Sequence, residues 1–328
     1  MNTNSSLYKE LTLNEIKALL NANFNTDVLH EAKLLEGGLF NTTYMVCYGD
    51  DKKRSVLRCG PVNRHLLMAF EENLMQAEMF VYELCEKAKV PCSHVLACDT
   101  SKKIMNRDYM FVEYIESVAL SSTSIQNGQK PDLYCQVGKY MNQFHAITNS
   151  SFGRVSYIVT GRSFSSWYDY LIFEIKDIIQ RSRKFNAFSE NEIHLITSVL
   201  IKYKLLLEEI KKPHLIHSDL WDGNVLISNK NGQYDVAAII DADRAIFGDV
   251  DFEFASPWMI NTDFLRGYDV DFDFTDFGSE SRRTRRKIYL MLYDLIEAYV
   301  GIAEYNNQKQ FYDNKKQVLT LALELLSR

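Results

Sequence analysis

Two polar side chains flank a predicted β-hairpin in the second half of this 328-residue chain. Residues 225–228 and 236–240 are apolar runs separated by a polar Asn-Gly turn, which predicts two antiparallel strands. Pairing these runs places Asn224 and Asp241 side by side at the open end of the hairpin. Amide and carboxylate oxygens placed together are ligands that Mg²⁺ uses when it also binds phosphate groups. A magnesium site is therefore expected at this end of the hairpin.

A third polar group, Asp219, lies on the loop that enters the hairpin. It precedes Asn224 by five residues, so its carboxylate can face the same point and accept the proton of a hydroxyl group. His217 completes the pattern H-x-D-x-x-x-x-N in the segment HSDLWDGN. Apolar residues precede this segment, and the hairpin with its terminal aspartate follows it, so the context supports a catalytic loop.

This segment resembles the catalytic loop of kinases, and the chain is identified as a member of the aminoglycoside phosphotransferase and choline kinase-like family. The resemblance extends over about residues 30 to 260. It implies an α+β fold of the two-lobed protein kinase type, in which a small β-rich lobe with one long helix precedes a larger, mainly helical lobe. It also implies that the protein uses ATP and Mg²⁺.

The resemblance assigns roles to the polar residues. Asp219 becomes the catalytic base, and Asn224 becomes a Mg²⁺ ligand. Asp241 takes the position of the aspartate in the DFG motif of protein kinases, and Asp243 is a second candidate metal ligand. His217 belongs to the catalytic loop as well, where we predict that it braces the loop by hydrogen bonds rather than carrying a proton.

The spacing of apolar residues divides the chain into two unlike parts. Up to residue 115, short β-type runs surround one helical pattern at 69–88. Beyond residue 115, helical patterns prevail. They cover residues 132–147, 165–184, 190–211 and 283–305. We therefore predict a nucleotide-binding lobe at 1–115 and a catalytic and acceptor-binding lobe at 116–328.

The turn that should cover the ATP phosphates is expected just before residue 44. Gly37 and Gly38 would let the backbone approach the phosphates closely, and Asn41 and Thr42 follow them as candidate nucleotide contacts. The G-x-G-x-x-G pattern of protein kinases is absent, so an ordinary hairpin turn is the alternative.

Arg58 stands where kinases present a phosphate-binding lysine. A guanidinium keeps the positive charge and can grip two oxygens, although its geometry differs from that of an ammonium group. Lys52 or Lys53 could act instead, but both lie in a predicted turn. Glu78 matches the helix glutamate that pairs with this cation in kinases, and a solvated helix face is the alternative.

Residues 109–115 are predicted to form the last strand of the first lobe and the linker to the second. The family resemblance implies that the linker backbone hydrogen-bonds the adenine, which makes Glu113 and Ile115 candidate nucleotide contacts. The side chains of this segment could equally be part of the core.

The composition limits the partners and the compartment. The net charge of −6 argues against a general nucleic-acid binder, which needs an excess of Lys and Arg. Six cysteines lack the spacing of a zinc site or a disulfide framework. The N-terminus is polar, and no apolar run approaches the ~20 residues that span a bilayer. We expect a cytoplasmic monomer or homodimer without nucleic-acid or membrane partners.

The expected acceptor is a small molecule that carries a hydroxyl group. No A-P-E motif follows Asp243, so the peptide-docking segment of protein kinases is not expected. Residues 263–280 are rich in acids and would suit a cationic acceptor such as an aminosugar, or they form a solvated loop neutralised by the basic residues 282–287. The alternatives are a protein kinase and a nucleotide-binding module without turnover.

Overall fold

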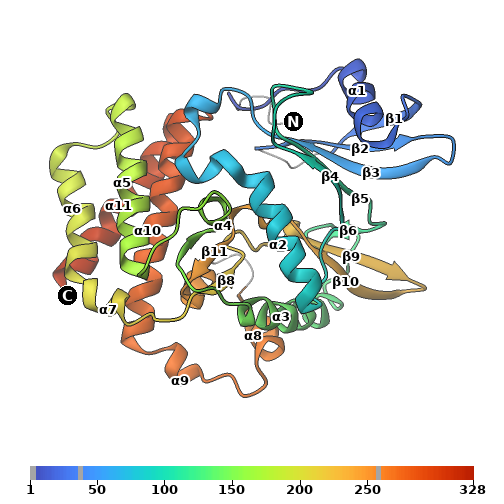
Figure 1. The fold of residues 1–328 in the computed structure, drawn as a ribbon. Helices are drawn as coiled ribbons and strands as arrows, with labels where there is room; N and C mark the ends of the chain where they lie inside the picture. Colours follow the sequence, from blue (N-terminus) through green and yellow to red (C-terminus); the bar gives the residue numbers. More distant parts are fainter. Residues whose placement is uncertain (1–4, 36–39, 256–259) are drawn as a thin grey trace.

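A five-stranded antiparallel sheet dominates the first part of the chain (Figure 1). The computed structural model describes residues 5–35, 40–255 and 260–328. The strands are β1 (Leu29–Leu34), β2 (Thr42–Tyr48), β3 (Lys53–Cys59), β4 (Val95–Asp99) and β5 (Tyr109–Glu113). Their order in the sheet is β1-β2-β3-β5-β4, which makes β3 the central strand. Arg58 lies on this central strand.

Helix α1 (Leu13–Phe24) covers one face of this sheet. It begins with a capping box, in which Thr12 accepts from the Glu15 amide and the Glu15 side chain accepts from the Thr12 amide. Its buried residues Ile16, Leu19 and Leu20 pack in one apolar cluster with residues of β2, β3 and β5.

Helix α2 (Leu74–Ala88) connects the sheet to the second part of the chain. The predicted helix at 69–88 begins as a 3₁₀ segment, Ala69–Asn73, and continues as α2. Ala77, Val81 and Cys85 pack in the same apolar cluster as residues of the second part, including Leu220 and Val225. The side of α2 that carries Glu78 is therefore buried between the two parts.

The second part is mainly helical and also contains two smaller sheets (Figure 1). The helices are α3 (Lys130–Ala146), α4 (Val155–Ile158), α5 (Trp167–Ser182), α6 (Glu190–Lys202), α7 (Lys204–Glu208), α8 (Thr262–Tyr268), α9 (Phe274–Phe277), α10 (Glu280–Ala303) and α11 (Gln308–Ser327). The pattern at 190–211 is broken into α6 and α7 at Tyr203, and α11 was not predicted.

Two small sheets hold the segments that carry the predicted catalytic residues. One consists of β6 (Val118–Ala119), β9 (Val225–Lys230) and β10 (Gln233–Ile239), in the order β10-β9-β6. The other consists of β7 (Gly153–Arg154), β8 (His214–Ile216) and β11 (Ile246–Gly248), in the order β7-β11-β8. The catalytic loop therefore runs from β8 of one sheet to β9 of the other.

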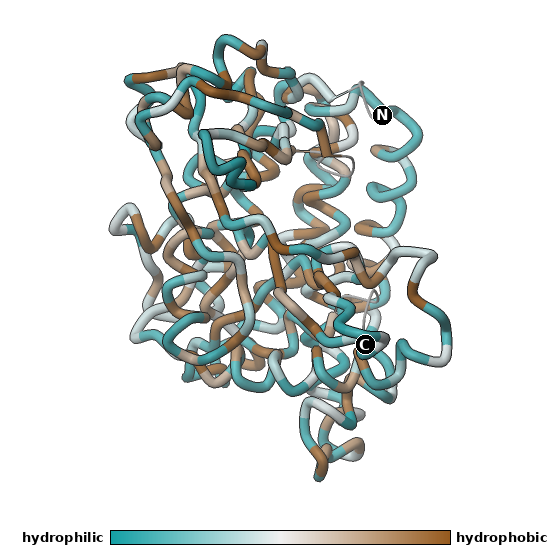
Figure 2. The backbone as a smooth tube through the Cα atoms, turned by 90° about the vertical axis from the view of Figure 1, so that its right-hand side faces the viewer, coloured by the Kyte–Doolittle hydropathy of each residue, from teal (hydrophilic) through white to brown (hydrophobic). Residues whose placement is uncertain are grey.

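Hydrophilic and hydrophobic residues alternate along the described helices, as expected when one face of a helix is buried (Figure 2). Among the described residues, no helix is both long enough and apolar enough to cross a membrane.

Candidate active site

The hairpin brings Asn224 and Asp241 to its open end. Strand β9 pairs with β10 so that Val225 faces Ile239, and one step further the Ile240 amide donates to the Asn224 carbonyl at 2.9 Å. Asp241 follows with a φ of 62°, in the left-handed region, which turns the chain out of the strand and into a short 3₁₀ segment. Asn224 and Asp241 therefore lie side by side at the open end of the hairpin, as the sequence pattern predicted.

His217 holds the catalytic loop against the hairpin. Its ring Nε2 donates to the Ile240 carbonyl at 2.9 Å, and its Nδ1 accepts from the Asp219 amide at 3.3 Å. Its own amide donates to the Glu253 carboxylate at 2.7 Å. Because both ring nitrogens are engaged and the side chain is fully buried, His217 is a structural residue of the loop.

Asp219 is placed by the loop and by Asn224. The Asn224 Nδ2 donates to the Asp219 carbonyl at 2.8 Å, which leaves Oδ1 of Asn224 as the atom suited to bind a metal. Burial raises the pKa of Asp219 to about 7, against the opposing effect of Arg244 and with a further contribution from Asp241. A carboxylate with such a pKa is a stronger base than an exposed aspartate, as a group that accepts a hydroxyl proton should be.

Arg58 links the two parts of the chain. One Nη group donates to Glu78 on α2, and the other donates to Asp241 at the end of the hairpin. Tyr82 adds a second link, since its hydroxyl donates to Glu78 at 2.6 Å and accepts from the Asp241 amide at 3.1 Å. Glu78 is fully buried, so the alternative of a solvated helix face is wrong.

The pKa values of these carboxyl groups follow from burial and from Arg58. Burial raises the pKa of Glu78, although Arg58 opposes this effect. Burial acts in the same direction on Asp241, but Arg58 outweighs it and holds the pKa of that carboxyl below its ordinary value. Asp241 is therefore ionised when it meets a cation.

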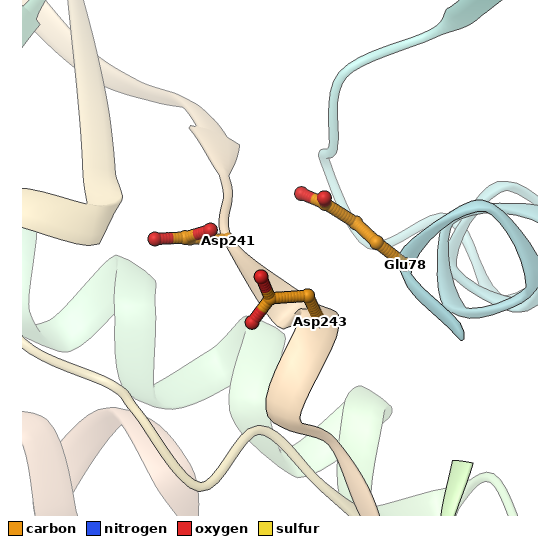
Figure 3. A group of neighbouring side chains, drawn as sticks. All are labelled: Glu78, Asp241 and Asp243. Atoms are coloured by element: carbon orange, nitrogen blue, oxygen red, sulfur yellow. The ribbon is translucent and has the colours of Figure 1, made fainter. Parts of the chain in front are cut away.

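Glu78, Asp241 and Asp243 form a cluster of carboxylates (Figure 3). One oxygen of each lies within 4.8 Å of the others. The Glu78 Oε2 is buried and has no hydrogen-bond partner among the described residues. Burial, followed by Asp241 and Glu78, raises the pKa of Asp243 well above its ordinary value. Three carboxylates face the single positive charge of Arg58, so this set of hard oxygen ligands fits a divalent cation.

A cleft of about 1320 Å³ opens at this cluster. Its apolar part is lined by Leu35, Val56, Val112, Ile115, Leu226 and Ile240. Its polar part is lined by Arg244, Tyr293, Glu297, Glu304, Tyr305 and Asn306. Asp219, Asn224 and Asp241 line the same cleft.

Four of the eight predicted nucleotide contacts line this cleft, and Arg58 is one of them. Asn41, Glu113 and Ile115 line it, as the sequence analysis expected. Gly37 and Gly38 lie outside the described residues.

Thr42 is placed elsewhere. Its side chain is fully buried, its hydroxyl donates to the Lys9 carbonyl at 2.9 Å, and it accepts from Arg107 at 2.9 Å. Thr43 lines the cleft instead and lies opposite Arg58 in the pairing of β2 with β3. Neighbouring residues of a strand point to opposite faces, so the expected contact shifts from Thr42 to Thr43.

The acidic residues that line the cleft differ from those expected. No described residue of 263–280 lines it, and Asp276 of that segment binds Arg282 at the surface. The carboxylates in the polar part of the cleft are Glu297 and Glu304, both contributed by the C-terminal end of α10. They are seven residues apart and therefore share one face of the helix. This spacing was visible in the sequence, but it does not tell which face meets the cleft.

The basic segment after residue 281 neutralises buried acids. Arg285 donates to Asp249 at 2.8 Å and to Asp251 at 2.7 Å. Arg282 and Arg286 also bind Asp251. Because Asp251 is buried and bound by three arginines, this network stabilises the fold behind the cleft rather than binding a polyanion.

The fold and the site define a class of protein. A five-stranded sheet with one long helix precedes a mainly helical part. An aspartate and an asparagine of the loop and an aspartate of the hairpin meet an arginine in one cleft, and this arginine is paired with a buried glutamate. This is the arrangement of a protein kinase-like phosphotransferase. The family model described as "Phosphotransferase enzyme family" (APH) matches residues 31–287, and the chain belongs to this family. It is a small-molecule kinase.

Solved structures share the fold at low sequence identity. The aminoglycoside phosphotransferase APH(4)-Ia aligns with a TM-score of 0.66 and 18% identity, covering 95% of this chain and 99% of that chain. A protein from Thermobifida fusca assigned as a fructosamine-3-kinase has a TM-score of 0.64 and 17% identity, covering 94% and 99%. APH(2")-IIa, solved with streptomycin and ATP, has a TM-score of 0.62 and 14% identity, covering 95% and 100%.

These likenesses confirm the predicted two-lobed α+β fold of the protein kinase type. A comparison with curated protein sequences found no match.

Proposed function

We propose that this protein transfers the γ-phosphate of ATP to a hydroxyl group of a small, amine-bearing molecule, with Mg²⁺ as the metal. The observation that carries the proposal is the meeting of Asp219, Asn224 and Asp241 with Arg58 in one cleft, where the buried Glu78 holds Arg58 from behind. These groups come from both parts of the chain, as binding of a nucleotide between two lobes requires.

The N-terminal lobe, residues 1–115, would hold the nucleotide against the C-terminal lobe, residues 116–328. The apolar part of the cleft suits the adenine, and the backbone at 113–115 offers it hydrogen-bonding groups. Arg58 is the cation nearest to the metal-binding aspartates and would reach the phosphates from the central strand.

Asn224, Asp241 and Asp243 would hold the metal ion. Bound there, Mg²⁺ would neutralise charge on the ATP phosphates. The fit rests on the ligand types and their proximity, since an amide oxygen and two carboxyl groups are hard donors and the carboxyl oxygens of the cluster lie within 4.8 Å of one another.

Asp219 would orient the acceptor hydroxyl. The hydroxyl oxygen attacks the γ-phosphorus, the bond from that phosphorus to the β–γ bridging oxygen breaks, and ADP leaves. The hydroxyl proton passes to the Asp219 carboxylate. Since the loop is fixed by His217 and Asn224, Asp219 needs little rearrangement to act, which favours catalysis by positioning.

An amine on the acceptor is supported by the polar part of the cleft. Glu304 is 2% exposed, and its Oε1 has no hydrogen-bond partner among the described residues. Glu297 lines the same wall. An ammonium group would supply the missing partner for such a carboxylate. The solved relatives whose names mention aminoglycosides or fructosamine support the same choice of acceptor.

The proposal is tested by Mg²⁺-dependent ADP formation with a panel of aminosugars, amino alcohols and their N-acetylated forms. We expect turnover with free amines, weaker turnover after acetylation, and loss of turnover by orders of magnitude in Asp219→Asn with ATP affinity retained. An Asp219→Asn protein with near-full activity would refute the catalytic assignment. ATP binding without turnover on any acceptor would favour the nucleotide-binding module.

A further inference from the structure

More than one cationic side chain lines the cleft, and these side chains differ in how many hydrogen bonds they make to the protein. Among the described residues, the cations that line it are Arg58, Arg154 and Arg244, and no lysine does so. A phosphoryl group in transfer carries negative charge on its equatorial oxygens, which cationic hydrogen-bond donors stabilise. An arginine can bind such a group only through N–H donors that make no hydrogen bond to the protein.

Arg58 and Arg154 each make at least two hydrogen bonds to the protein. Both Nη groups of Arg58 bind carboxylates. The Arg154 Nε donates to Glu174 at 2.7 Å and its Nη1 donates to the Arg244 carbonyl at 2.8 Å. Arg154 is 3% exposed, so it stabilises the structure beneath the cleft.

Arg244 is engaged less completely. Its Nη2 donates to Glu71 at 3.0 Å, and this is the one hydrogen bond that its guanidinium makes to the described residues. A guanidinium has five N–H donors. The side chain is 23% exposed and lines the cleft, so the remaining donors are available to a ligand there.

The surroundings of Arg244 hold it in place. Glu71 is buried and is itself fixed by the Met68 amide at 2.9 Å. The guanidinium carbon lies 5.6 Å from the Phe70 ring centre and 5.9 Å from that of Phe40, within the range of cation–π contacts. Such fixed cations need little reorganisation when charge develops nearby.

Arg244 also sits at the junction between the expected phosphates and the acceptor. Phe40 and Asn41 belong to the segment predicted to cover the phosphates, and both line this cleft. The Arg244 carbonyl accepts from the hydroxyl of Ser218 at 2.7 Å, and Ser218 directly precedes Asp219. The backbone of Arg244 is therefore tied to the catalytic loop, and its side chain shares the cleft with Asp219 and Glu304.

We infer that Arg244 donates hydrogen bonds to the γ-phosphoryl group of ATP and stabilises its charge during transfer. The inference rests on the proposed function and adds a catalytic residue to it. Arg58 would then contact the phosphates near the metal ion, and Arg244 would contact the γ-phosphoryl group next to the acceptor.

Nucleotide binding tests the inference without any acceptor. Arg244→Ala is made in a Glu71→Gln parent, because Glu71 would otherwise be buried without its cation. With Mg²⁺ present, we expect affinity for the β,γ-imido analogue of ATP to fall at least about tenfold while affinity for ADP stays within about twofold, because only the analogue has a γ-phosphoryl group. Calorimetric titration measures both. Arg266→Ala, which removes an exposed arginine of α8, is the matched control.

Turnover and chemical rescue give the second readout. We expect kcat to fall by about 10²–10³-fold, as for loss of one transition-state donor, with partial recovery in guanidinium chloride and none in methylammonium chloride. Arg244→Lys should keep the charge and recover only part of the rate.

Three results would overturn the inference. The first is an equal loss of affinity for both nucleotides, which marks a structural residue. The second is unchanged affinity for both nucleotides with kcat within about threefold of the parent, which would leave an anionic group of the acceptor as the ligand. The third is an unsubstituted protein that binds no nucleotide, which would refute the proposed function itself.

Discussion

Asp219, the proposed base, shows at the level of one residue how a buried carboxyl group costs stability. Its pKa of about 7 in the folded protein lies above the ordinary value of 3.8, so the proton held by the folded form stabilises it at low pH. That stability is fully present below the ordinary pKa and is lost as the pH rises through about 7. At pH 8 the buried charge therefore opposes folding.

We predict that Asp219→Asn raises the melting temperature of the nucleotide-free protein more at pH 8 than at pH 5, by about 2 °C or more, because the amide carries no charge. Thermal unfolding at the two pH values measures this. Asp263→Asn, outside the cleft, is the control. Equal gains at both pH values would show that burial does not control this carboxyl.

Arg58 and Glu78 form the second residue-level test. Arg58→Ala leaves Glu78 buried without a cation, and we expect the free energy of unfolding to drop by about 3–5 kcal/mol. Arg58→Ala with Glu78→Gln should recover part of this loss, because the buried charge is gone. Urea denaturation measures both variants. A double variant no more stable than Arg58→Ala would argue against a buried ion pair.

At the scale of elements, the catalytic loop depends on β8, β9 and β10 being locked together. His217 spans these segments through the Ile240 carbonyl and the Asp219 amide. A residue of this kind affects rate through position rather than through proton transfer.

We predict that His217→Ala lowers the free energy of unfolding by about 2 kcal/mol, since it leaves buried backbone groups without partners, and lowers kcat at least tenfold. The shape of the pH–rate profile should stay the same. His194→Ala on α6 is the control. A pH–rate profile of different shape would mean that His217 takes part in proton transfer.

At the scale of the whole molecule, the nucleotide should join the two lobes. The groups expected to bind it come from β3, the linker at 113–115 and the hairpin, so binding should stabilise the entire chain. At an ATP concentration of about 100 times Kd, linkage gives a gain of about 2.7 kcal/mol.

We predict that ATP with Mg²⁺ raises the melting temperature by several degrees, and that EDTA or Asp241→Asn removes most of this shift. The reason is that the metal neutralises the carboxylates that would otherwise repel the phosphates. Scanning calorimetry measures the shift. A shift that EDTA leaves unchanged would contradict the metal site.

Much of the fold followed from short-range patterns. The capping box at Thr12, the hairpin at 225–240 and helix α5 are local, so residue spacing predicts them. The break between α6 and α7 at Tyr203 and helix α11 were missed. The break depends on packing between distant helices, which no local window contains. Helix α11 does carry a local signal, since Asn307 caps it and Phe311, Val318, Ala322 and Leu325 are buried at helical spacing.

The sequence by itself determined which chemistry is present. Asp219, Asn224 and Asp241 are tied to one loop and one hairpin, so spacing alone brought them together. Only the tertiary structure decided which neighbours face them. It places Thr43 rather than Thr42 on the cleft, and it places Glu297 and Glu304 there rather than the acidic residues at 263–280.

The physical reason is the separation along the chain. Arg58 meets Asp241 across 183 positions, and Arg244 meets Glu71 across 173. Strand alternation and helical periodicity fix which residues share a face, but the orientation of that face depends on how the sheet, helix α2 and the mainly helical part pack together. As a result of that packing, the Arg244 guanidinium makes one hydrogen bond to the described residues and its other N–H donors are available, which the sequence did not predict.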